Sequence, residues 1–211
     1  MGYLKIKRII DILLSLIGLI VLSPVFLILI IAIKLDSKGP VLFKQKRVGV
    51  HKSHFNILKF RTMSIDTPKD IPTHLMVNPE QYITKMGRFM RKTSLDELPQ
   101  IWNIFVGQMT IIGPRPALWN QYDLIFERDK YGANDVPPGL TGWAQINGRD
   151  ELPIEVKARL DGEYVQRMSF RMDVKCFFVT LISIVKSDGV VEGGTGKLAR
   201  EEVAVTKETI K

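Results

Sequence analysis

The sequence predicts a mostly helical α+β protein that begins with a re-entrant membrane helix hairpin. Three observations support this prediction. A long apolar run near the N-terminus is interrupted by a serine and a proline, most of the positive charge lies beside that run, and shorter apolar segments follow in both helical and strand-like patterns. The later helices are too short to span a bilayer, so we expect them to pack in a small α/β domain or to lie amphipathically at the membrane surface.

The apolar run covers residues 12–33 and contains only Ser15, Gly18, Ser23 and Pro24 as exceptions. A straight helix over this run would be about 33 Å long, which is enough to cross a bilayer, so a single transmembrane anchor is the simplest interpretation. However, a central proline removes one helical hydrogen bond and kinks the helix. The neighbouring serine can return a hydrogen bond to the freed backbone. Each half then reaches only the bilayer centre.

Basic residues flank the apolar run on both sides, whereas a spanning helix normally keeps its basic excess on one side. This symmetry favours a re-entrant hairpin with both ends on the cytoplasmic side, broken at Ser23-Pro24. The flanking residues are Lys5, Lys7 and Arg8 before the run, and Lys34, Lys38, Lys44, Lys46 and Arg47 after it.

The net charge of +8 is concentrated near the N-terminus. Residues 1–61 carry a balance of +9, and the rest of the chain carries −1. This distribution suits an anionic membrane surface or a phosphorylated substrate held there. Nucleic-acid binding is the alternative interpretation of the charge. It is disfavoured because aromatic residues are not interleaved with the basic ones and no nucleic-acid motif is present.

Cysteine and histidine offer little chemistry in this chain. Cys176 is the only cysteine, so an intramolecular disulfide is excluded and a reducing compartment is natural. It lies in an apolar stretch and is expected to be a small core residue. The three histidines, His51, His54 and His74, lack the spacing of zinc ligands and are expected to be surface or packing residues.

After a turn at 37–40, residues 41–43 and 55–60 are predicted to form a short antiparallel strand pair joined by a basic loop. Strand alternation would place Lys59 and Arg61 on one face. That face could simply be solvated, or the two cations could form a cradle for phosphate. Residues 64–83 contain several prolines and are expected to be loop-like.

Two adjacent carboxylates, Asp96 and Glu97, follow a basic segment that contains Arg88. By pattern alone, Ser94 and Glu97 form a capping box at a helix start. Pro99 cannot donate a backbone hydrogen bond, so the helix should break or restart there. The two carboxylates are therefore expected on a short turn at a helix junction, where they are more exposed than residues in the middle of a helix.

The second half of the chain presents two more arginines in turns. A buried strand at 109–112 leads into Gly-Pro-Arg-Pro, in which two prolines fix the backbone around Arg115. A turn-rich segment then leads to Asn147-Gly148, a strong turn signal that displays Arg149. Helices are predicted at 100–106, 153–166 and 173–186. The expected domains are a membrane helix at 1–40, a catalytic domain at 41–190 and a loose charged tail at 191–211.

Taken together, these motifs resemble the bacterial sugar transferase family, the small monotopic polyprenyl-phosphate phosphoglycosyl transferases. The resemblance covers residues 5 to about 190, and the motifs follow one another in the same order as in the family. The matching segments are the apolar run with Ser23-Pro24, Phe43 to Gly49, Lys59 to Met63, Thr93 to Gln100, Gly113 to Pro116, Leu140 to Gln145 and Asn147 to Arg149.

The resemblance implies a two-step reaction at the cytoplasmic face of the bacterial inner membrane. Asp96 would attack the sugar-linked phosphate of a UDP-sugar, release UMP and form a covalent phosphosugar-aspartyl intermediate. Polyprenyl (undecaprenyl) phosphate would then take the phosphosugar and give a polyprenyl diphosphate sugar, the first membrane step of a surface glycan. A ping-pong reaction of this kind divides one difficult step into two.

The same resemblance, with the chemistry of the residues, assigns roles within the site. Asp96 and Glu97 are the expected catalytic residues and Mg²⁺ ligands, because Mg²⁺ prefers carboxylate and phosphate oxygens. Whether Glu97 holds the metal or handles the acceptor's proton stays open. The expected substrate-binding residues, which would clamp phosphates and uridine, are Lys59, Arg61, Arg88, Arg115 and Arg149.

The alternative function is a membrane-anchored, nucleotide-sugar-binding scaffold without catalysis. The adjacent carboxylate pair argues against it, because a binding module needs no nucleophile. The expected partners are a UDP-sugar, polyprenyl phosphate and the lipid bilayer, and nucleic acid is not among them. The sugar that is transferred, the glycan pathway and the oligomeric state, a homo-oligomer included, are left open by the sequence.

Overall fold

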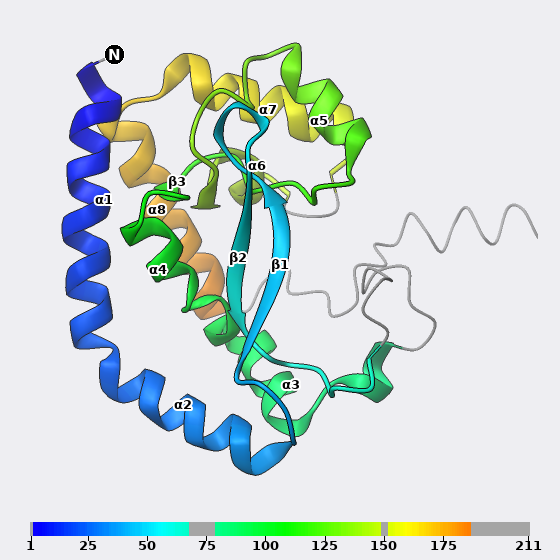
Figure 1. Ribbon diagram of the computed structural model, residues 1–211. Coiled ribbons are helices and arrows are strands. Elements are labelled where there is room, and N and C mark those ends of the chain that lie inside the picture. The colour runs from blue at the N-terminus through cyan, green and yellow to red at the C-terminus, as the bar shows by residue number, and fades with distance from the viewer. Residues whose placement is uncertain (1, 68–78, 149–151, 187–211) are drawn as a thin grey trace, which may run out of the picture.

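The computed structural model describes residues 2–67, 79–148 and 152–186 (Figure 1). As predicted, the fold is mostly helical with small sheets. Its longer elements are α1 (Gly2–Val21), α2 (Ser23–Asp36), β1 (Leu42–Val48), β2 (His54–Phe60), α3 (Lys85–Thr93), α4 (Gln100–Phe105), α5 (Tyr122–Asp129), α7 (Ile154–Arg167) and α8 (Phe170–Lys186). The shorter ones are η1 (Val50–Lys52), η3 (Pro79–Tyr82), η4 (Leu95–Glu97), β3 (Thr110–Ile112), β4 (Gly139–Thr141) and α6 (Trp143–Ile146).

The N-terminal helix breaks at the predicted position. α1 and α2 meet at an angle of 59°. Pro24 lacks the N–H that would bond to the carbonyl of Ile20, and the hydroxyl of Ser23 donates to that carbonyl instead, at 2.7 Å. Among the described residues no single helix has the length and hydropathy needed to cross a membrane, whereas α1 and α2 meet that test as a bent pair.

α1 is packed with its polar side inward. Lys7, Asp11 and Ser15 follow one another at intervals of four residues and are all buried. The carboxylate of Asp11 accepts hydrogen bonds from the hydroxyl of Thr110 at 2.7 Å and from the backbone N–H of Ile111 at 3.0 Å. The outer side of the helix exposes large apolar side chains, among them Ile6, Ile9, Leu13, Ile17, Ile20 and Val21.

The start of α1 is tied to α8 and α7 through Asp173. Its carboxylate is buried and accepts hydrogen bonds from Lys7, from the hydroxyl of Tyr3 at 2.7 Å and from the hydroxyl of Tyr164 at 2.7 Å. Arg8 donates to the last carbonyl groups of α4, where its charge also complements the negative end of the helix dipole. The first two turns of α1 are thus fixed by polar contacts to the globular part of the chain.

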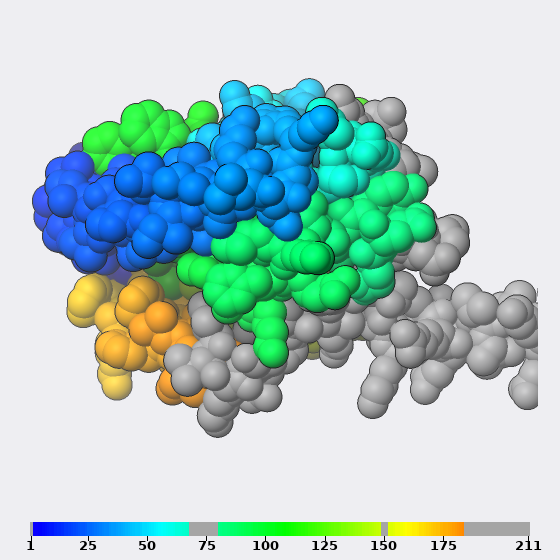
Figure 2. All heavy atoms as spheres, turned by 90° about the horizontal axis from the view of Figure 1, so that it is seen from below, coloured from blue at the N-terminus to red at the C-terminus, as the bar shows by residue number. Residues whose placement is uncertain are grey.

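The end of α2 is fixed to the same globular part by an apolar cluster. Leu29 and Ile33 pack with Phe60 of β2 and Met90 of α3, and all four side chains are buried. Asp36 then accepts a hydrogen bond from the backbone N–H of Met86 at 3.1 Å. Seen from below, α2 and the neighbouring α3–α4 region form one continuous surface (Figure 2). Both ends of the bent pair therefore attach to one body.

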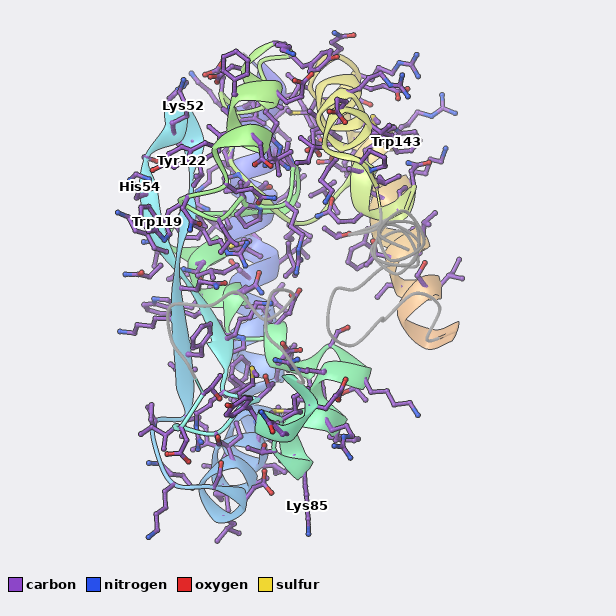
Figure 3. All side chains as sticks on the ribbon, turned by 90° about the vertical axis from the view of Figure 1, so that its right-hand side faces the viewer. Lys52, His54, Lys85, Trp119, Tyr122 and Trp143 are labelled. Carbon is purple, nitrogen blue, oxygen red and sulfur yellow. The ribbon has the colours of Figure 1, made fainter. Side chains whose placement is uncertain are left out.

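β1 and β2 form the predicted antiparallel hairpin, with Leu42 opposite Phe60 and Val48 opposite His54. The predicted bounds of the first strand, 41–43, were too short: residues 44–48, expected in the basic loop, continue β1 because they pair in register with residues 54–58. Lys52 and His54 lie on the same side of the molecule as Trp119 and Tyr122, while Trp143 lies on the opposite side (Figure 3). A second, two-stranded sheet pairs β3 with β4 in parallel. α3, β4, α5 and α6 were not among the sequence predictions. β4 and α6 are very short, and α3 and α5 lie in segments without a clear apolar period.

The remaining predictions about single residues mostly agree with the structure. Cys176 is fully buried beside Ile112 and Tyr164, as expected of a small core residue. His51 and His54 are exposed at the hairpin. His74 and the tail at 191–211 lie outside the described residues.

We expect Lys7→Met to destabilise the protein, because it leaves the buried Asp173 carboxylate without its cation. Breaking a buried ion pair by removing one partner costs roughly 3–5 kcal/mol. Lys5→Met, an exposed position on the same helix, is the matched control and should change the free energy of unfolding by no more than about 0.5 kcal/mol. Thermal unfolding in detergent measures both; equal melting temperatures for the two variants would contradict the packing of α1 described above.

Candidate active site

The two adjacent carboxylates lie on a short turn between α3 and α4. α3 is capped at its start by Thr84, whose hydroxyl accepts from the N–H of Gly87 at 2.9 Å. It ends at Ser94, which has a left-handed backbone (φ 56°) that is unusual for a residue other than glycine. The chain then forms the single 3₁₀ turn η4, which contains Asp96 and Glu97. α4 begins directly after Pro99, so the predicted restart of the helix at this proline is confirmed, although Leu98 and Pro99 themselves keep helical dihedral angles.

The predicted capping box between Ser94 and Glu97 is wrong. Ser94 closes α3, and its N–H bonds back to the carbonyls of Met90 and Arg91, while its own carbonyl accepts from the N–H of Glu97 at 3.2 Å at the start of η4. Its side chain makes no capping hydrogen bond to η4. Instead, the carboxylate of Glu97 accepts hydrogen bonds from two cationic side chains. The physical reason is that Ser94 ends α3 in a left-handed conformation and begins only the single 3₁₀ turn of η4, so no α-helix starts at this serine.

Glu97 joins two of the predicted substrate-binding residues in an ion triad. One carboxylate oxygen accepts hydrogen bonds from Nζ of Lys59 at 2.7 Å and from Nη2 of Arg115 at 2.8 Å. The three side chains are 22%, 19% and 33% exposed, in that order. Burial alone would raise the pKa of Glu97, but Arg115 and Lys59 outweigh it and lower the pKa well below its usual range. Glu97 is therefore ionised and held by two cations.

Asp96 has the opposite electrostatic environment. Burial raises its pKa above the usual value, against the opposing effect of Lys59, while the negative charge of Glu97 adds to the rise. Arg91 and Arg115 favour the ionised carboxylate and so lower the pKa of Asp96, but their effects are weaker. A carboxylate in a poorly solvated position is more reactive once it is ionised, because less water has to be removed before it attacks. The two carboxylates are thus distinguished by their surroundings rather than by their chemistry.

Arg115 is positioned by the second sheet. The N–H of Gly113 donates to the carbonyl of Thr141 at 2.8 Å, and the N–H of Gly139 donates to the carbonyl of Pro114 at 2.8 Å. A Cβ atom on Gly142 would lie 2.1 Å from the carbonyl oxygen of Gly113, so only glycine allows α6 to approach this closely. The loop around Arg115 is therefore held on both sides, which agrees with the expectation of a rigidly framed guanidinium.

The other three predicted substrate-binding residues, all arginines, are not part of the ion triad. Arg61 is buried and donates to Ser37 and to the carbonyl of Pro40, at distances of 2.6–2.9 Å, so it ties the end of α2 to β2. Arg88 lies exposed on α3. Arg149 lies outside the described residues. The roles predicted for these three stay predictions.

Arg91 is a site residue that the sequence predictions omitted. It acts electrostatically on Asp96, and its Nε donates to the hydroxyl of Thr62 at 3.0 Å. The basic run before the carboxylates contains several cations, and the sequence does not show which of them turns back toward Asp96. The left-handed residue at Ser94 decides this, because it folds η4 back onto the last turn of α3.

The acidic residues of the turn match the chemistry of a magnesium site that is completed by substrate. In the described part of the chain no three His, Cys, Asp or Glu side chains gather as a metal site. Mg²⁺ commonly binds one or two carboxylates and takes its other ligands from substrate phosphates and water. Asp96 and Glu97, adjacent on one turn, can supply the protein ligands of such a site.

Comparisons with known proteins place the chain in a family. The family model described as bacterial sugar transferase matches residues 2–187. The chain is 38% identical over 185 residues to the uncharacterized sugar transferase EpsL of Bacillus subtilis, with 88% of this chain and 90% of that protein covered. It is also 33% identical over 197 residues to the exopolysaccharide production protein ExoY of Sinorhizobium fredii, with 87% of each covered.

A third relative is longer. The chain is 40% identical over 184 residues to the UDP-glucose:undecaprenyl-phosphate glucose-1-phosphate transferase of Escherichia coli, with 83% of this chain but only 39% of that protein covered. This chain thus spans nearly the whole of some relatives and well under half of others. The family predicted from the sequence motifs is confirmed, and so is the prediction of a transferase enzyme: the chain belongs to the bacterial sugar transferase family.

Proposed function

We propose that this chain transfers a phosphosugar from a UDP-sugar to a membrane polyprenyl phosphate, releasing UMP and forming a polyprenyl diphosphate sugar. The observation that carries the proposal is the turn with Asp96 and Glu97, which is surrounded by cations from three separate segments of the chain. The names of the relatives in Escherichia coli and Sinorhizobium fredii support the same reaction and a role in making exopolysaccharide.

Asp96 is the proposed nucleophile. Its carboxylate attacks the phosphorus next to the sugar, the bond to the UMP oxygen breaks, and UMP leaves with the bonding electron pair. The phosphosugar then sits on Asp96 as an acyl phosphate. A phosphate oxygen of the polyprenyl phosphate attacks the same phosphorus in the second step and returns Asp96 as a carboxylate. Asp96 is suited to this role because, unlike Glu97, it is not held by two cations.

Lys59, Arg115 and Arg91 supply positive charge for the phosphates. An anionic nucleophile and a diphosphate repel each other, so the charge has to be spread before attack is possible. Arg115 can bind phosphate oxygens through two parallel N–H groups, and its framed loop reduces the entropy lost on binding. Glu97 neutralises Lys59 and Arg115 when no phosphate is bound. Mg²⁺, held by Asp96 and Glu97, would neutralise further charge on the diphosphate.

The bent helix pair supports a re-entrant position in the membrane. Lys7, Asp11 and Arg8 fix the start of α1 to the globular part of the chain, and Ile33 and Asp36 fix the end of α2 to the same part. Two ends that attach to one body lie on one side of a bilayer. The outward apolar side of α1 then contacts lipid. We propose that the enzyme lies on the cytoplasmic face of the bacterial inner membrane, the location that the family resemblance implies.

This placement fits the lipid substrate. The tail of a polyprenyl phosphate stays in the bilayer while its phosphate lies at the interface. Drawing the lipid out would cost about 0.8 kcal/mol per exposed CH₂ group. α8 exposes further apolar side chains, among them Phe177, Phe178 and Ile182, which are suited to the same interface. An active site just above the helix pair can therefore meet the lipid head group without extracting it.

We expect Asp96→Asn to abolish UMP release, because an amide cannot act as the nucleophile. Loss of a catalytic nucleophile typically lowers the rate by a factor of about 10⁴ or more. Glu155→Gln, an exposed carboxylate on α7, is the matched control and should retain full activity. UMP release from a panel of UDP-sugars, with Mg²⁺ and polyprenyl phosphate, measures the rate. Mass spectrometry of the wild type with its donor should find the adduct on a peptide containing position 96. Turnover by Asp96→Asn at the wild-type rate would refute the nucleophile.

The two arginines of α3 should differ in their effects on the reaction. Arg91 lies near Asp96, so we expect Arg91→Met to lower kcat/KM for the donor on the order of 10- to 100-fold, the usual value of a charged hydrogen bond. Arg88→Met changes an exposed residue one turn earlier and should cost less than about threefold. Steady-state UMP release measures both. A larger loss for Arg88→Met would support the role predicted from the sequence and contradict the one assigned from the structure.

The membrane arrangement can be tested by labelling single cysteines at the exposed positions 5 and 38, in a Cys176→Ala background. In sealed vesicles of known orientation, we expect a membrane-impermeant thiol reagent to modify both positions from the cytoplasmic side. The reason is that both ends of the bent pair attach to the same globular part. Labelling of the two positions from opposite sides would show that the helix pair crosses the membrane.

A further inference from the structure

The side-chain amide of Gln100 is buried beside the catalytic turn without a hydrogen-bond partner. Gln100 is the first residue of α4 and is only 1% exposed. Among the described residues, neither its amide nitrogen nor its amide oxygen has a hydrogen-bond partner. An unpaired buried amide is costly, and an apolar side chain of similar size would avoid the cost. The amide therefore calls for a functional explanation.

Asn103 shows that an amide in this location can be fully paired. It lies one helical turn after Gln100 on the same side of α4 and is equally buried, at 1%. Its Nδ2 donates to the carbonyl of Asn56 at 2.9 Å and to the side chain of Gln108 at 2.7 Å. Its Oδ1 accepts from the N–H of Leu58 at 3.0 Å. Burial against β2 is thus no obstacle to hydrogen bonding.

The backbone directs Gln100 toward Glu97. Leu98 and Pro99 keep helical dihedral angles, so the turn of η4 continues into α4. The hydrogen bonds along this stretch, such as the one from the N–H of Ile101 to the carbonyl of Leu98 at 3.0 Å, span three residues. In such a 3₁₀ arrangement, side chains three residues apart are eclipsed, and helical side chains lean toward the N-terminal end. The amide of Gln100 therefore follows Glu97 on the same side and leans toward it.

Glu97 needs a new partner whenever phosphate binds. In the structure, Lys59 and Arg115 are both bonded to one oxygen of Glu97. The diphosphate of the donor, whose binding here rests on the proposed function, requires the same two cations. Once they turn to phosphate, Glu97 keeps the proposed Mg²⁺ as a partner but loses both of its hydrogen-bond donors, although it is largely buried. The amide nitrogen of Gln100, three residues further along the chain, is a donor without an acceptor among the residues that the structure describes.

We propose that Gln100 is a positioning residue that donates a hydrogen bond to Glu97 when the donor diphosphate takes Lys59 and Arg115. The amide is unpaired in the free enzyme and paired in the substrate complex. The hydrogen bond holds Glu97 beside Asp96 and lowers the cost of releasing both cations to the phosphates. Gln100 touches neither substrate nor metal in this arrangement, so its effect on the reaction passes through Glu97.

The test compares Gln100→Met with Asn103→Leu as the matched control, using the full chain purified in detergent. Thermal unfolding is measured with and without UDP and Mg²⁺, since UDP carries the uridine and the diphosphate whatever the sugar. Gln100→Met should keep or raise the melting temperature of the free protein, because it removes an unpaired buried amide. It should weaken UDP binding on the order of tenfold and reduce the UDP-induced shift. Asn103→Leu should lower the melting temperature of the free protein.

Two results would overturn the proposal for Gln100 and leave the proposed function intact. If Gln100→Met lowers the melting temperature of the free protein as much as Asn103→Leu does, the amide is already paired without substrate. If Gln100→Met keeps the full UDP-induced shift and the wild-type KM for the donor, the amide plays no part in the complex. A wild-type protein that UDP does not stabilise would instead overturn the proposed function itself, and this proposal with it.

Discussion

The carboxylate of Glu97 holds the active site together. One of its oxygens accepts hydrogen bonds from Lys59, on the β1–β2 hairpin, and from Arg115, on the loop after β3. These segments are far apart in the sequence, and the turn that carries Glu97 joins them. In the proposed function, Lys59 and Arg115 bind the phosphate of the substrate. Without substrate, the carboxylate of Glu97 takes the place of that phosphate beside the two cations. Exchanging one anion for another avoids leaving two partly buried cations unpaired.

The N-terminal helices reverse the usual arrangement of a surface helix, and this supports the proposed position of the protein in a membrane. Polar side chains on α1 face the protein, where Asp11 and Lys7 find buried partners, and apolar side chains face outward. In water this would expose a large apolar surface, whereas in a bilayer it satisfies both sides of the helix. The break at Ser23-Pro24 lets the chain return to the globular part, because the serine hydroxyl satisfies the carbonyl that the proline leaves unpaired.

Three energetically unfavourable local features lie close together in and around the proposed catalytic turn. Ser94 adopts a left-handed backbone, which costs on the order of 1 kcal/mol for a residue other than glycine. Asp96 has a raised pKa, and Gln100 buries an unpaired amide. Sequences are locally consistent with their folds except where function requires otherwise. Three exceptions within seven residues therefore support the proposed active site at this turn, independently of the family to which the chain belongs.

The sequence by itself determined the family, the break in the N-terminal helix, the hairpin and the position of the carboxylate pair. These features depend on short-range signals: a proline in an apolar run, strand alternation, and motifs that are contiguous in the chain. Only the tertiary structure decided which charges meet. It assigned Arg61 to the end of α2, brought Arg91 toward Asp96 and replaced the capping box at Ser94 with an ion triad. The reason is that a side chain's partner depends on how distant segments pack, and one left-handed residue redirects the chain without a local sequence signal.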